Sequence, residues 1–368
     1  MSRLDPPNLA SLRQAIDAVD DQVLALLNHR AGLAAEVGRL KTEVSPEALF
    51  HAPKREREVL TRLVAANGGP FPDTAVRTIF QEIMSACLSL EKPLRVAFLG
   101  PEGTFTHLAA RHQFGGSSQA LPQGTIQAVF QAVERARADY GVVPVENATE
   151  GAVDSTLDAF LESPLRICAE ILLPVDQALL VRPGLDLGSV RRVYSHAQGL
   201  GQCSRWLEAH IPQADRIEAP STSEAARLAR EDGEGAAVAS ELAAELFGLQ
   251  VAETKIQDLA ANATRFLVLG PKSAEPTGRD RTTLLALARD GSGALLRLLE
   301  PLARRGLNLS RIQSRPTRRN LWEYAFFLDV EGHAEDPLMA EALVELQHAC
   351  ASLKVLGSYP QAVTEGLP

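Results

Sequence analysis

Three basic residues near the N-terminus could together bind a small anion. Arg30 and Lys41 lie in a segment whose apolar residues recur every three or four positions. On a helix they would fall within about 20° of each other and roughly 16 Å apart along the axis, so that long side chains could converge on one anion. Arg13 would lie some 25 Å from Arg30 and could serve only the site of an antiparallel partner chain. The alternative, which spacing alone favours, is that all three are solvated surface charges.

Polar residues also follow apolar runs in the middle of the chain. A glycine-rich turn that includes Thr104 joins a predicted strand to a predicted helix; free N–H groups there favour an anion, although such a turn can equally be a simple connection. Glu146 and Asn147 end a second apolar run, and Ser195 and His196 end a third, at positions where open α/β sheets bind ligands. Neighbours on a strand point to opposite faces, so a direct Ser195–His196 nucleophilic pair is not expected. His196 could also be a structural histidine.

The basic residues near the N-terminus need a long helix to carry them. The apolar spacing over residues 8 to about 41 predicts an amphipathic helix of roughly 50 Å. A second helix is predicted to begin at Ala52-Pro53, with proline at its first position, and a third to run to about Glu91. Three helices of this size cannot bury so long an apolar stripe. A partner chain is therefore expected.

The rest of the chain divides into two further regions. From Leu94 to about residue 272, short apolar runs alternate with helical stretches, which predicts an α/β domain of largely parallel strands in two lobes with a cleft between them. Residues 273–281 are predicted to be a linker. Beyond them the order strand, helix, strand, strand, helix, strand is typical of a ferredoxin-like α+β fold. The predicted domains are 1–92, 93–272 and 282–368.

Length and composition exclude several classes of protein. A chain of 368 residues, 45% apolar and 23% charged, predicts a globular protein of two or three domains. A net charge of −9 argues against general nucleic-acid binding, and no apolar run approaches the roughly 18 residues of a membrane span. Four scattered cysteines without a CxxC pair predict reduced thiols and a cytoplasmic protein. We expect no metal and no cofactor, because the histidines lack ligand spacing and no nucleotide-binding motif occurs.

Several motifs resemble a known enzyme family. All-helical chorismate mutases have segments similar to LRQAIDAVDDQVLALLNHRAGLAAEVGRLK, PKREREV and FQEIMSACLSLE. Prephenate dehydratases have segments similar to GPEGTFTHLAA, YGVVPVENATEGAV, YSHAQGLGQC and NATRFLVLG. Phenylalanine-sensing ACT domains have segments similar to GALLRLLEPLARRGLNLSRIQSRP and KVLGSYP. In this order they resemble the bifunctional chorismate mutase/prephenate dehydratases, over nearly the whole chain.

The resemblance implies a fold and an activity for each region. The folds would be an all-α intertwined mutase dimer, a two-lobed α/β dehydratase domain similar to periplasmic binding proteins, and a ferredoxin-like ACT domain. The activities would be rearrangement of chorismate to prephenate, decarboxylative dehydration of prephenate to phenylpyruvate, and feedback inhibition by L-phenylalanine. The assembly would be a homodimer or a tetramer.

In the mutase region the resemblance assigns residues to a dianionic substrate. Arg13 of the partner chain, Arg30 and Arg55 would hold carboxylates. Lys41 would donate to the breaking ether oxygen, and Glu56 would bind the ring hydroxyl. Because chorismate rearranges without a covalent intermediate, positioning and charge would supply the catalysis.

Three positions depart from the family's mutase pattern. Ala52 replaces an aspartate that contacts the substrate, and Cys87 replaces a serine. The second donor to the ether oxygen is Glu91 instead of glutamine, and a carboxyl can donate only when protonated. We therefore expect mutase activity to fall as the pH rises through the Glu91 pKa. The alternative is that Glu91 is a solvated residue at a helix end.

In the dehydratase region the resemblance points to Thr264 as hydrogen-bond donor to the hydroxyl that prephenate loses. Glu146 is a candidate source of the proton. Arg265 could bind a substrate carboxylate or tie loops together. The substrate contacts implied by the resemblance are Thr104, Glu146, Asn147, Ser195, His196, Asn262, Arg265 and Phe266.

In the C-terminal region two segments match the phenylalanine-binding segments of ACT domains. They supply Gly293, Ala294, Leu295, Asn308, Gln313, Ser314, Arg315 and Pro316. Gln313 replaces the usual glutamate, which we expect to alter the strength of feedback inhibition more than its existence. Two alternatives remain open: a prephenate dehydratase with a silent mutase domain, and a non-catalytic ligand-binding regulatory protein. Retention of both sets of catalytic residues argues against the second.

Overall fold

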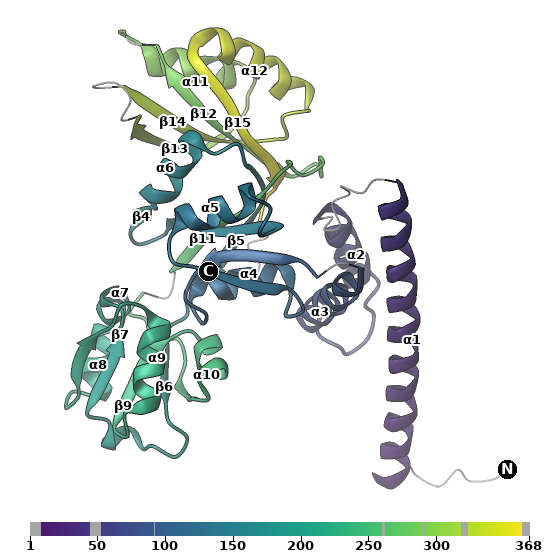
Figure 1. Cartoon of the computed structure of the whole chain (residues 1–368), viewed down its shortest axis with the longest axis vertical. Coiled ribbons are helices and arrows are strands. Elements are labelled where there is room, and N and C mark those ends of the chain that lie inside the picture. The colour runs from purple at the N-terminus through teal and green to yellow at the C-terminus, as the bar shows by residue number, and fades with distance from the viewer. Residues whose placement is uncertain are drawn as a thin grey trace, which may run out of the picture. The chain divides into compact units, whose positions relative to one another are not determined.

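The computed structural model describes residues 9–44, 53–91, 93–259, 262–289, 291–317 and 323–362. The chain packs into two compact units (Figure 1), one made of Met1–Leu94 and Phe114–Ser118, the other of Arg95–Gln113 and Gln119–Pro368. In the described part of the chain, none of the helices combines the length and apolar character needed to span a membrane.

The first unit is helical. Its described helices are α1 (Leu9–Val44), α2 (Pro53–Ala65) and α3 (Asp73–Glu91). Proline begins α2, as predicted, where its missing N–H costs no helical hydrogen bond. The apolar stripe of α1 is uncovered in the single chain: Leu12, Ile16 and Val23 are 49%, 59% and 48% exposed. As expected from its length, the stripe is not buried by the two shorter helices.

The second unit begins with a lobe built on a sheet of order β2-β1-β3-β11-β5, in which the short β4 pairs with the end of β3. Its strands are β1 (Arg95–Leu99), β2 (Gln119–Gln123), β3 (Tyr140–Asn147), β4 (Gly151–Ala152), β5 (Arg166–Pro174) and β11 (Ala263–Gly270). Its helices are α4 (Phe105–Phe114), α5 (Ile126–Glu134) and α6 (Asp154–Glu162). Helices α5 and α6 pack on the face that carries Val143, Leu267 and Leu269.

The second lobe is inserted between β5 and β11 and has a sheet of order β10-β6-β9-β7-β8. Its strands are β6 (Ala178–Val181), β7 (Arg192–Ser195), β8 (Asp215–Glu218), β9 (Gly235–Ala239) and β10 (Gln250–Glu253). Its helices are α7 (Ala197–Gln202), α8 (Ser204–His210), α9 (Thr222–Glu231) and α10 (Glu241–Phe247), with a short 3₁₀ turn at Leu187–Ser189. The predicted two-lobed architecture is confirmed.

The sheets of the two lobes are mixed, so the expectation of largely parallel strands is wrong. Strands β1, β2 and β3 pair in parallel, as do β7, β8 and β9. Strand β11 is antiparallel to both of its neighbours, and β6 is antiparallel to both of its own. The cause is the double crossing of the chain between lobes, because each returning strand enters its sheet in the opposite direction.

The C-terminal domain has the predicted ferredoxin-like order. It consists of β12 (Asp280–Ala288), α11 (Ala294–Arg304), β13 (Leu309–Pro316), β14 (Tyr324–Glu331), α12 (Pro337–Ala349) and β15 (Cys350–Pro360). The sheet order is β13-β14-β12-β15, and α11 and α12 cover one face (Figure 1). Strand β12 begins at Asp280, inside the predicted linker, where the Asp280 carboxylate accepts the N–H groups of Thr277 and Gly278.

The other face of this sheet completes the core of the first lobe. Side chains of the C-terminal domain, among them Leu285, Phe327 and Leu356, belong to the same buried cluster as Val143 and Leu267 of the lobe. The approach is close enough to require glycine at one position: a Cβ at Gly357 would lie 2.1 Å from the backbone oxygen of Ile167 in β5. The C-terminal domain and the first lobe therefore share one apolar core.

Candidate active sites

Two predicted site residues meet at the end of the first lobe's sheet. Strands β3 and β11 place Asn147 opposite Thr264, and Nδ2 of Asn147 donates to Oγ1 of Thr264 at 2.8 Å. The two side chains are buried, with exposed fractions of 9% and 8%. Oδ1 of Asn147 accepts the backbone N–H of Thr149 at 2.9 Å and its hydroxyl at 2.6 Å. These contacts fix the orientation of the amide, so its nitrogen faces Thr264.

The direction of this hydrogen bond determines what the Thr264 hydroxyl can do. Because its oxygen accepts from Asn147, its own hydrogen must point elsewhere. Among the hydrogen bonds of the described residues, none takes that hydrogen to a protein acceptor. The hydroxyl is thus a donor available to a bound molecule.

A cavity of about 520 Å³ is lined by Thr149, which hydrogen-bonds to Asn147, and by Gln198, Gln202 and Asn262. Asn262 lies two residues before Thr264 and therefore on the same side of the extended chain. Its side chain is 2% exposed, yet neither its amide nitrogen nor its amide oxygen has a protein partner. A buried amide without partners is costly, so Asn262 is a ready binding group for a polar ligand.

One cation lines the cavity among the described residues, and two carboxylates accompany it. Arg205 is exposed, and its guanidinium has no hydrogen bond or ion pair with the described residues. The Asp258 carboxylate accepts the backbone N–H groups of Arg205 at 3.2 Å and Trp206 at 3.3 Å, at the start of α8. The second carboxylate is that of Glu150. Because Asp258 is occupied by the helix end, the Arg205 charge is the one best able to meet an anion.

Other predicted dehydratase residues have structural contacts. The Ser195 hydroxyl is fully buried and donates to the carbonyl of Val238 at 2.7 Å, whereas His196 is exposed and is the N-cap residue of α7. This confirms that the two do not form a nucleophilic pair. The Thr104 hydroxyl donates to the carbonyl of Pro101 at 3.0 Å and stabilises the turn before α4. Phe266 is 1% exposed and packs in the interior.

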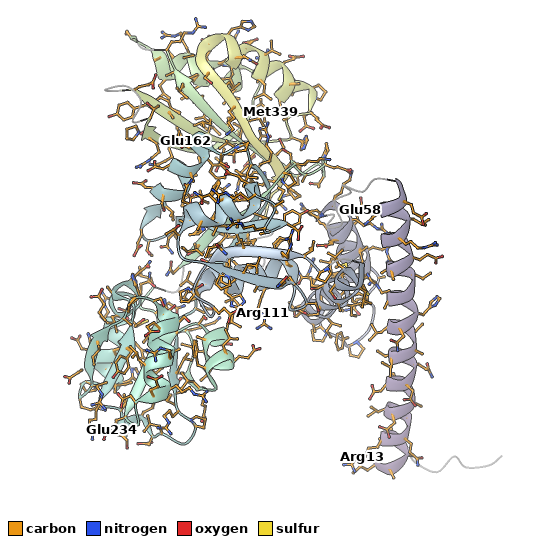
Figure 2. All side chains as sticks on the ribbon, viewed as in Figure 1. Arg13, Glu58, Arg111, Glu162, Glu234 and Met339 are labelled. Carbon is orange, nitrogen blue, oxygen red and sulfur yellow. The ribbon has the colours of Figure 1, made fainter. Side chains whose placement is uncertain are left out.

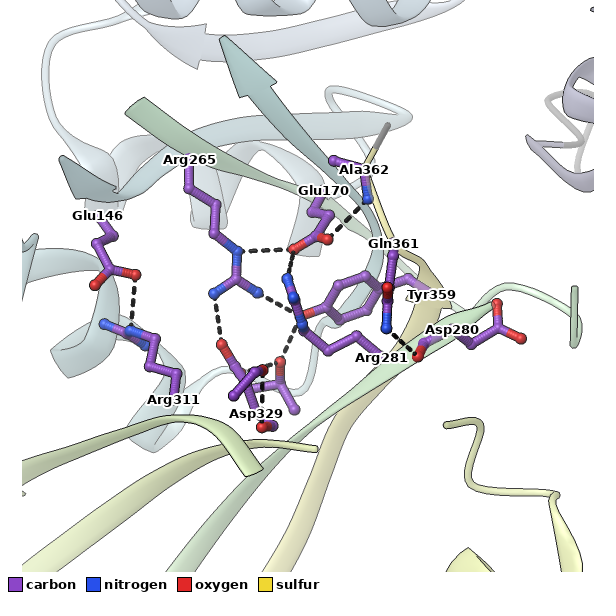
Figure 3. A network of polar contacts seen from close by, with 12 residues as sticks. Glu146, Glu170, Arg265, Asp280, Arg281, Arg311, Asp329, Tyr359, Gln361 and Ala362 are labelled. Atoms are coloured by element: carbon purple, nitrogen blue, oxygen red, sulfur yellow. Dashed lines mark hydrogen bonds and ion pairs between the residues drawn. The ribbon is translucent and has the colours of Figure 1, made fainter. Parts of the chain in front are cut away.

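Arg265 is not among the residues that line the cavity, and it contacts three polar side chains instead (Figure 3). Its Nε pairs with Glu170 at 2.8 Å, one Nη with Asp329 at 2.5 Å, and the other donates to the Tyr359 hydroxyl at 3.0 Å. Burial favours a lower pKa for Arg265, but Tyr359, Asp329 and Glu170 raise the pKa well above its usual value. Of the two interpretations of Arg265, the structure supports a tie between parts of the chain. These contacts use three of its five N–H groups, and the side chain is only 12% exposed.

Glu146 is also turned away from the cavity. Its carboxylate pairs with Nε of Arg311 in β13 at 3.0 Å, as Figure 3 shows. Its chain neighbour Asn147 takes the opposite face, where it contacts Thr264 and Thr149. The suggestion that Glu146 is the proton source for the dehydratase therefore lacks support from the geometry.

The helical unit brings two predicted mutase residues into contact. Nη1 of Arg30, in the middle of α1, donates to the sulfur of Cys87 in α3 at 2.8 Å. Cys87 is buried and Arg30 half-buried. Arg55 lies on the surface of α2, with Nη1 3.3 Å from the Glu58 carboxylate. Cys87 thus orients the Arg30 guanidinium.

The remaining predicted mutase residues are less closely grouped. Arg13 is exposed near the start of α1, as Figure 2 shows. Lys41 and Glu56 are half-buried in α1 and α2. Ala52 and the side chain of Glu91 lie outside the described residues. Across the described part of the chain, no group of three metal-ligating side chains comes together.

The first predicted phenylalanine segment lies at the start of α11. Gly293 has a left-handed φ of 75°, which favours glycine, and it precedes Ala294 at the first helical position. Leu295 follows in the first turn and is 39% exposed. Asn308 is exposed just before β13.

The second predicted phenylalanine segment is the end of the edge strand β13. Ser314 and Pro316 are exposed, whereas Gln313 and Arg315 are half-buried on the opposite side of the strand. Arg315 is not free for an effector, because Nη2 binds the Asp158 carboxylate of α6 at 2.8 Å. Its prediction as an effector contact does not fit this geometry.

Arg205, Thr149 and the glutamines of α7 were missed in the sequence. They follow Asn147 or Ser195 by two to ten residues and lie on short helices or loops, so only their position after a strand end points to them. The sequence offers Arg265 as the cation for a substrate carboxylate because Arg265 is adjacent to Thr264. Adjacency on a strand, however, puts a side chain on the other face.

Comparison with known proteins matches all three regions. The family models match chorismate mutase type II over residues 12–92, prephenate dehydratase over 96–274 and the ACT domain over 282–348. The chain is 44% identical to the bifunctional chorismate mutase/prephenate dehydratase of Stutzerimonas stutzeri over 366 residues, 99% of this chain and 100% of the relative. It is 46% identical to that of Aquifex aeolicus over 361 residues, 97% of this chain and 99% of the relative.

A solved structure agrees with the second unit. The prephenate dehydratase of Arthrobacter aurescens in complex with L-Phe has a TM-score of 0.67 and 38% identity, covering 72% of this chain and 89% of that chain. A helical mutase region, a two-lobed dehydratase and an ACT domain in one chain define a multifunctional enzyme with an attached regulatory domain. The chain belongs to the bifunctional chorismate mutase/prephenate dehydratase family.

Proposed function

We propose that this protein converts chorismate to prephenate in its helical unit and prephenate to phenylpyruvate in its two-lobed domain, under feedback inhibition by L-phenylalanine. The observation that carries the dehydratase assignment is the oriented Asn147–Thr264 pair, together with a nearby cavity whose lining includes Asn262, a buried residue whose amide has no protein partner. The protein acts in the cytoplasm as a homodimer or tetramer and needs no cofactor.

The mutase works by positioning and charge. Chorismate is a dianion whose rearrangement builds negative charge on the breaking ether oxygen. Arg30, held by Cys87, binds a carboxylate, and Lys41 donates to the ether oxygen. Arg13 reaches the site from the partner chain, which also covers the exposed stripe of α1.

Arg55 and Glu56 complete the mutase site from α2. Arg55 binds the other carboxylate, for which its exposed guanidinium has room beside Glu58. Glu56 binds the ring hydroxyl. Ala52 contributes only backbone, and Glu91 replaces the usual amide donor at the ether oxygen.

The dehydratase step is an elimination. The bond to one carboxylate breaks and releases CO₂, and its electron pair enters the ring. The ring C–O bond breaks as the hydroxyl takes up one proton from solvent and leaves as water, which makes the ring aromatic. The Thr264 hydroxyl donates to the departing oxygen, because Asn147 occupies its lone pair and leaves its hydrogen free. The hydrogen bond stabilises charge that develops only as the bond breaks.

The substrate's carboxylates need a cation and amide donors. Arg205 supplies the cation, and Asn262 and Gln202 supply donors within the same cavity. Gln202 is oriented for this, since its Oε1 accepts from Gln177 at 3.2 Å and its amide nitrogen remains to donate. Arg205 takes the role that the sequence had offered to Arg265.

The test is phenylpyruvate formation by the purified full-length protein given chorismate alone, with and without L-phenylalanine. Thr264→Ala should stop phenylpyruvate formation while prephenate accumulates, and Thr264→Ser, which keeps the hydroxyl, should retain part of the activity. Product from prephenate but not from chorismate would mean a silent mutase domain. No product from either substrate would contradict the enzyme assignment and leave the ligand-binding alternative.

A further inference from the structure

Residues next to the catalytic pair connect it to the regulatory domain. Glu146 and Arg265 are opposite each other in the pairing of β3 with β11, one position along from Asn147 and Thr264. Alternation puts them on the face that meets the C-terminal domain. Figure 3 shows Glu146 facing Arg311 and Arg265 facing Asp329, both of that domain.

Strand β13 holds both ends of one loop of the dehydratase site. We call residues 147–153 the active-site loop, since it carries Asn147, Thr149 and Glu150. Glu146, immediately before the loop, pairs with Arg311 at 3.0 Å. Asp154, immediately after it, pairs with Arg315 at 2.6 Å. Both arginines lie on the same side of β13 and are only 11% and 13% exposed in their side chains.

The two ends of the loop are held with different strength. Arg315 binds Asp154 and also Asp158, the latter through two of its nitrogens. Arg311 binds Glu146 through Nε, while its Nη2 is buried without a partner. The Arg315 end is thus held by two carboxylates and the Arg311 end by one. The Arg311–Glu146 pair is therefore the end with fewer contacts to the loop.

The predicted effector segment belongs to this same strand. Ser314 and Pro316 are exposed on the side of β13 opposite Arg311 and Arg315. A ligand that binds there contacts one side of the strand while the other side holds the active-site loop. Displacement of β13 by an ångström is enough to break a 3.0 Å ion pair next to Asn147.

We propose that Arg311 and Arg315 are positioning residues of the dehydratase, and that L-phenylalanine bound at Gln313–Pro316 inhibits by moving β13 relative to the active-site loop. The inference rests on the proposed function and adds a route between its two sites. It also assigns Arg315 to the loop and not to the effector. Coupling between two binding sites is reciprocal. A variant that lacks these contacts should therefore lose both the effect of L-phenylalanine on prephenate binding and the effect of prephenate on L-phenylalanine binding.

The experiment compares R311Q and R315Q with R305Q in the full-length protein. Arg305 is a matched control, since it is 17% exposed and pairs with Glu341 and Glu345 inside the C-terminal domain. For each variant, dehydratase kcat and KM, the half-inhibiting L-phenylalanine concentration and L-phenylalanine binding without prephenate are measured. Mutase activity in the same preparation shows that the chain is folded and that the protein concentration is correct.

In R311Q and R315Q we expect the half-inhibiting concentration to rise at least ~5-fold and kcat to fall more than KM changes, with phenylalanine binding retained within ~3-fold. R311K should restore part of the inhibition. If R311Q is insoluble, E146Q removes the same ion pair and the same criteria apply. The double variant E146Q/R311Q should resemble the worse single variant.

Three results would overturn the proposal. If the half-inhibiting L-phenylalanine concentration changes no more in R311Q and R315Q than in R305Q, the two arginines do not connect the effector segment to the active-site loop. Loss of phenylalanine binding in R315Q makes Arg315 an effector contact. Additive effects in E146Q/R311Q mean that the two residues do not act through each other. A wild-type protein without dehydratase activity would instead refute the proposed function, and the inference with it.

Discussion

Replacement of Asn147 by aspartate should reverse one hydrogen bond and stop the dehydratase. The two side chains have nearly the same shape, and an aspartate oxygen can still accept the N–H and hydroxyl of Thr149 as Oδ1 does now. The second oxygen, however, cannot donate to Thr264. The threonine hydroxyl would donate to the carboxylate, and its hydrogen would no longer be available to the departing hydroxyl of prephenate.

The size of the effect follows from what is lost. Wild-type Thr264 accepts at 2.8 Å and donates to the substrate, so the Asn147→Asp variant loses one preorganised donor at the point where charge develops. Loss of one such donor costs about 10²- to 10³-fold in kcat, or about 3–4 kcal/mol of transition-state stabilisation. A carboxylate beside an anionic substrate should also raise KM.

The assay is phenylpyruvate formation from prephenate as a function of pH, with mutase activity as an internal control. Burial raises the pKa of a carboxyl above its ordinary value of about 3.9. Below that pKa the new carboxyl is protonated and can donate to Thr264 again. The activity of Asn147→Asp should therefore recover as the pH falls, and the double variant with Thr264→Ala should be no worse than Thr264→Ala alone.

Two outcomes would refute this reasoning. If Asn147→Asp keeps kcat within ~3-fold of wild type at neutral pH, the direction of the Asn147–Thr264 bond does not matter to the reaction. If its activity falls in parallel with that of wild type at every pH, the proton on the introduced carboxyl does not control the hydroxyl of Thr264.

Three further predictions follow from the charges. Arg205→Gln should raise the KM for prephenate ~10-fold with mutase activity unchanged, whereas Arg191→Gln, whose Nη1 donates to the carbonyl of Gly188, should leave KM as it is. Asp329→Asn should lower the free energy of unfolding by about 3–5 kcal/mol at pH 7, measured by urea denaturation, because it leaves Arg265 buried with less charge to balance it. Burial favours a higher pKa for Asp329, yet Arg265 brings the pKa below its usual value. The stabilisation by the ionised Asp329 is therefore present above about pH 3.9 and is lost as the pH falls through the pKa of the folded protein. Wild type should show this loss of stability at low pH, and Asp329→Asn should not. For Glu91→Gln we expect a flatter mutase pH profile than wild type, and an unchanged profile would rule out a protonated Glu91 as donor.

In the two lobes, the strands predicted from apolar runs are those with buried residues. Runs such as Arg95–Leu99 and Gly235–Ala239 are central and apolar, and hydrophobic pattern alone identifies them. Strands β2, β8 and β10 were missed because they are edge strands with exposed positions and polar residues. Each of these strands is held in an extended conformation by hydrogen bonds to one adjacent strand, and the sequence alone does not show which strand that is.

Part of the site could be predicted from motifs, and part needed the fold. The motifs identified Asn147 and Thr264, but not that one donates to the other, which depends on the register of β3 and β11. They could not separate Arg265 from Arg205. Arg265 is next to Thr264 in the sequence, but strand alternation directs its side chain to the other face of the sheet. Arg205 is far from Thr264 in the sequence, yet it lines the cavity.

The shared core of the first lobe and the C-terminal domain has a consequence for synthesis on the ribosome. The second lobe is one continuous stretch of chain and has all its core residues once Ile256, shortly after β10, is made. The first lobe must wait for β11, which lies between β3 and β5 in its sheet, and its core is complete only when Leu356 and Tyr359 emerge. Domains that follow one another in the sequence therefore mature in a different order, and a nascent dehydratase domain carries an open apolar face until β15 has been made.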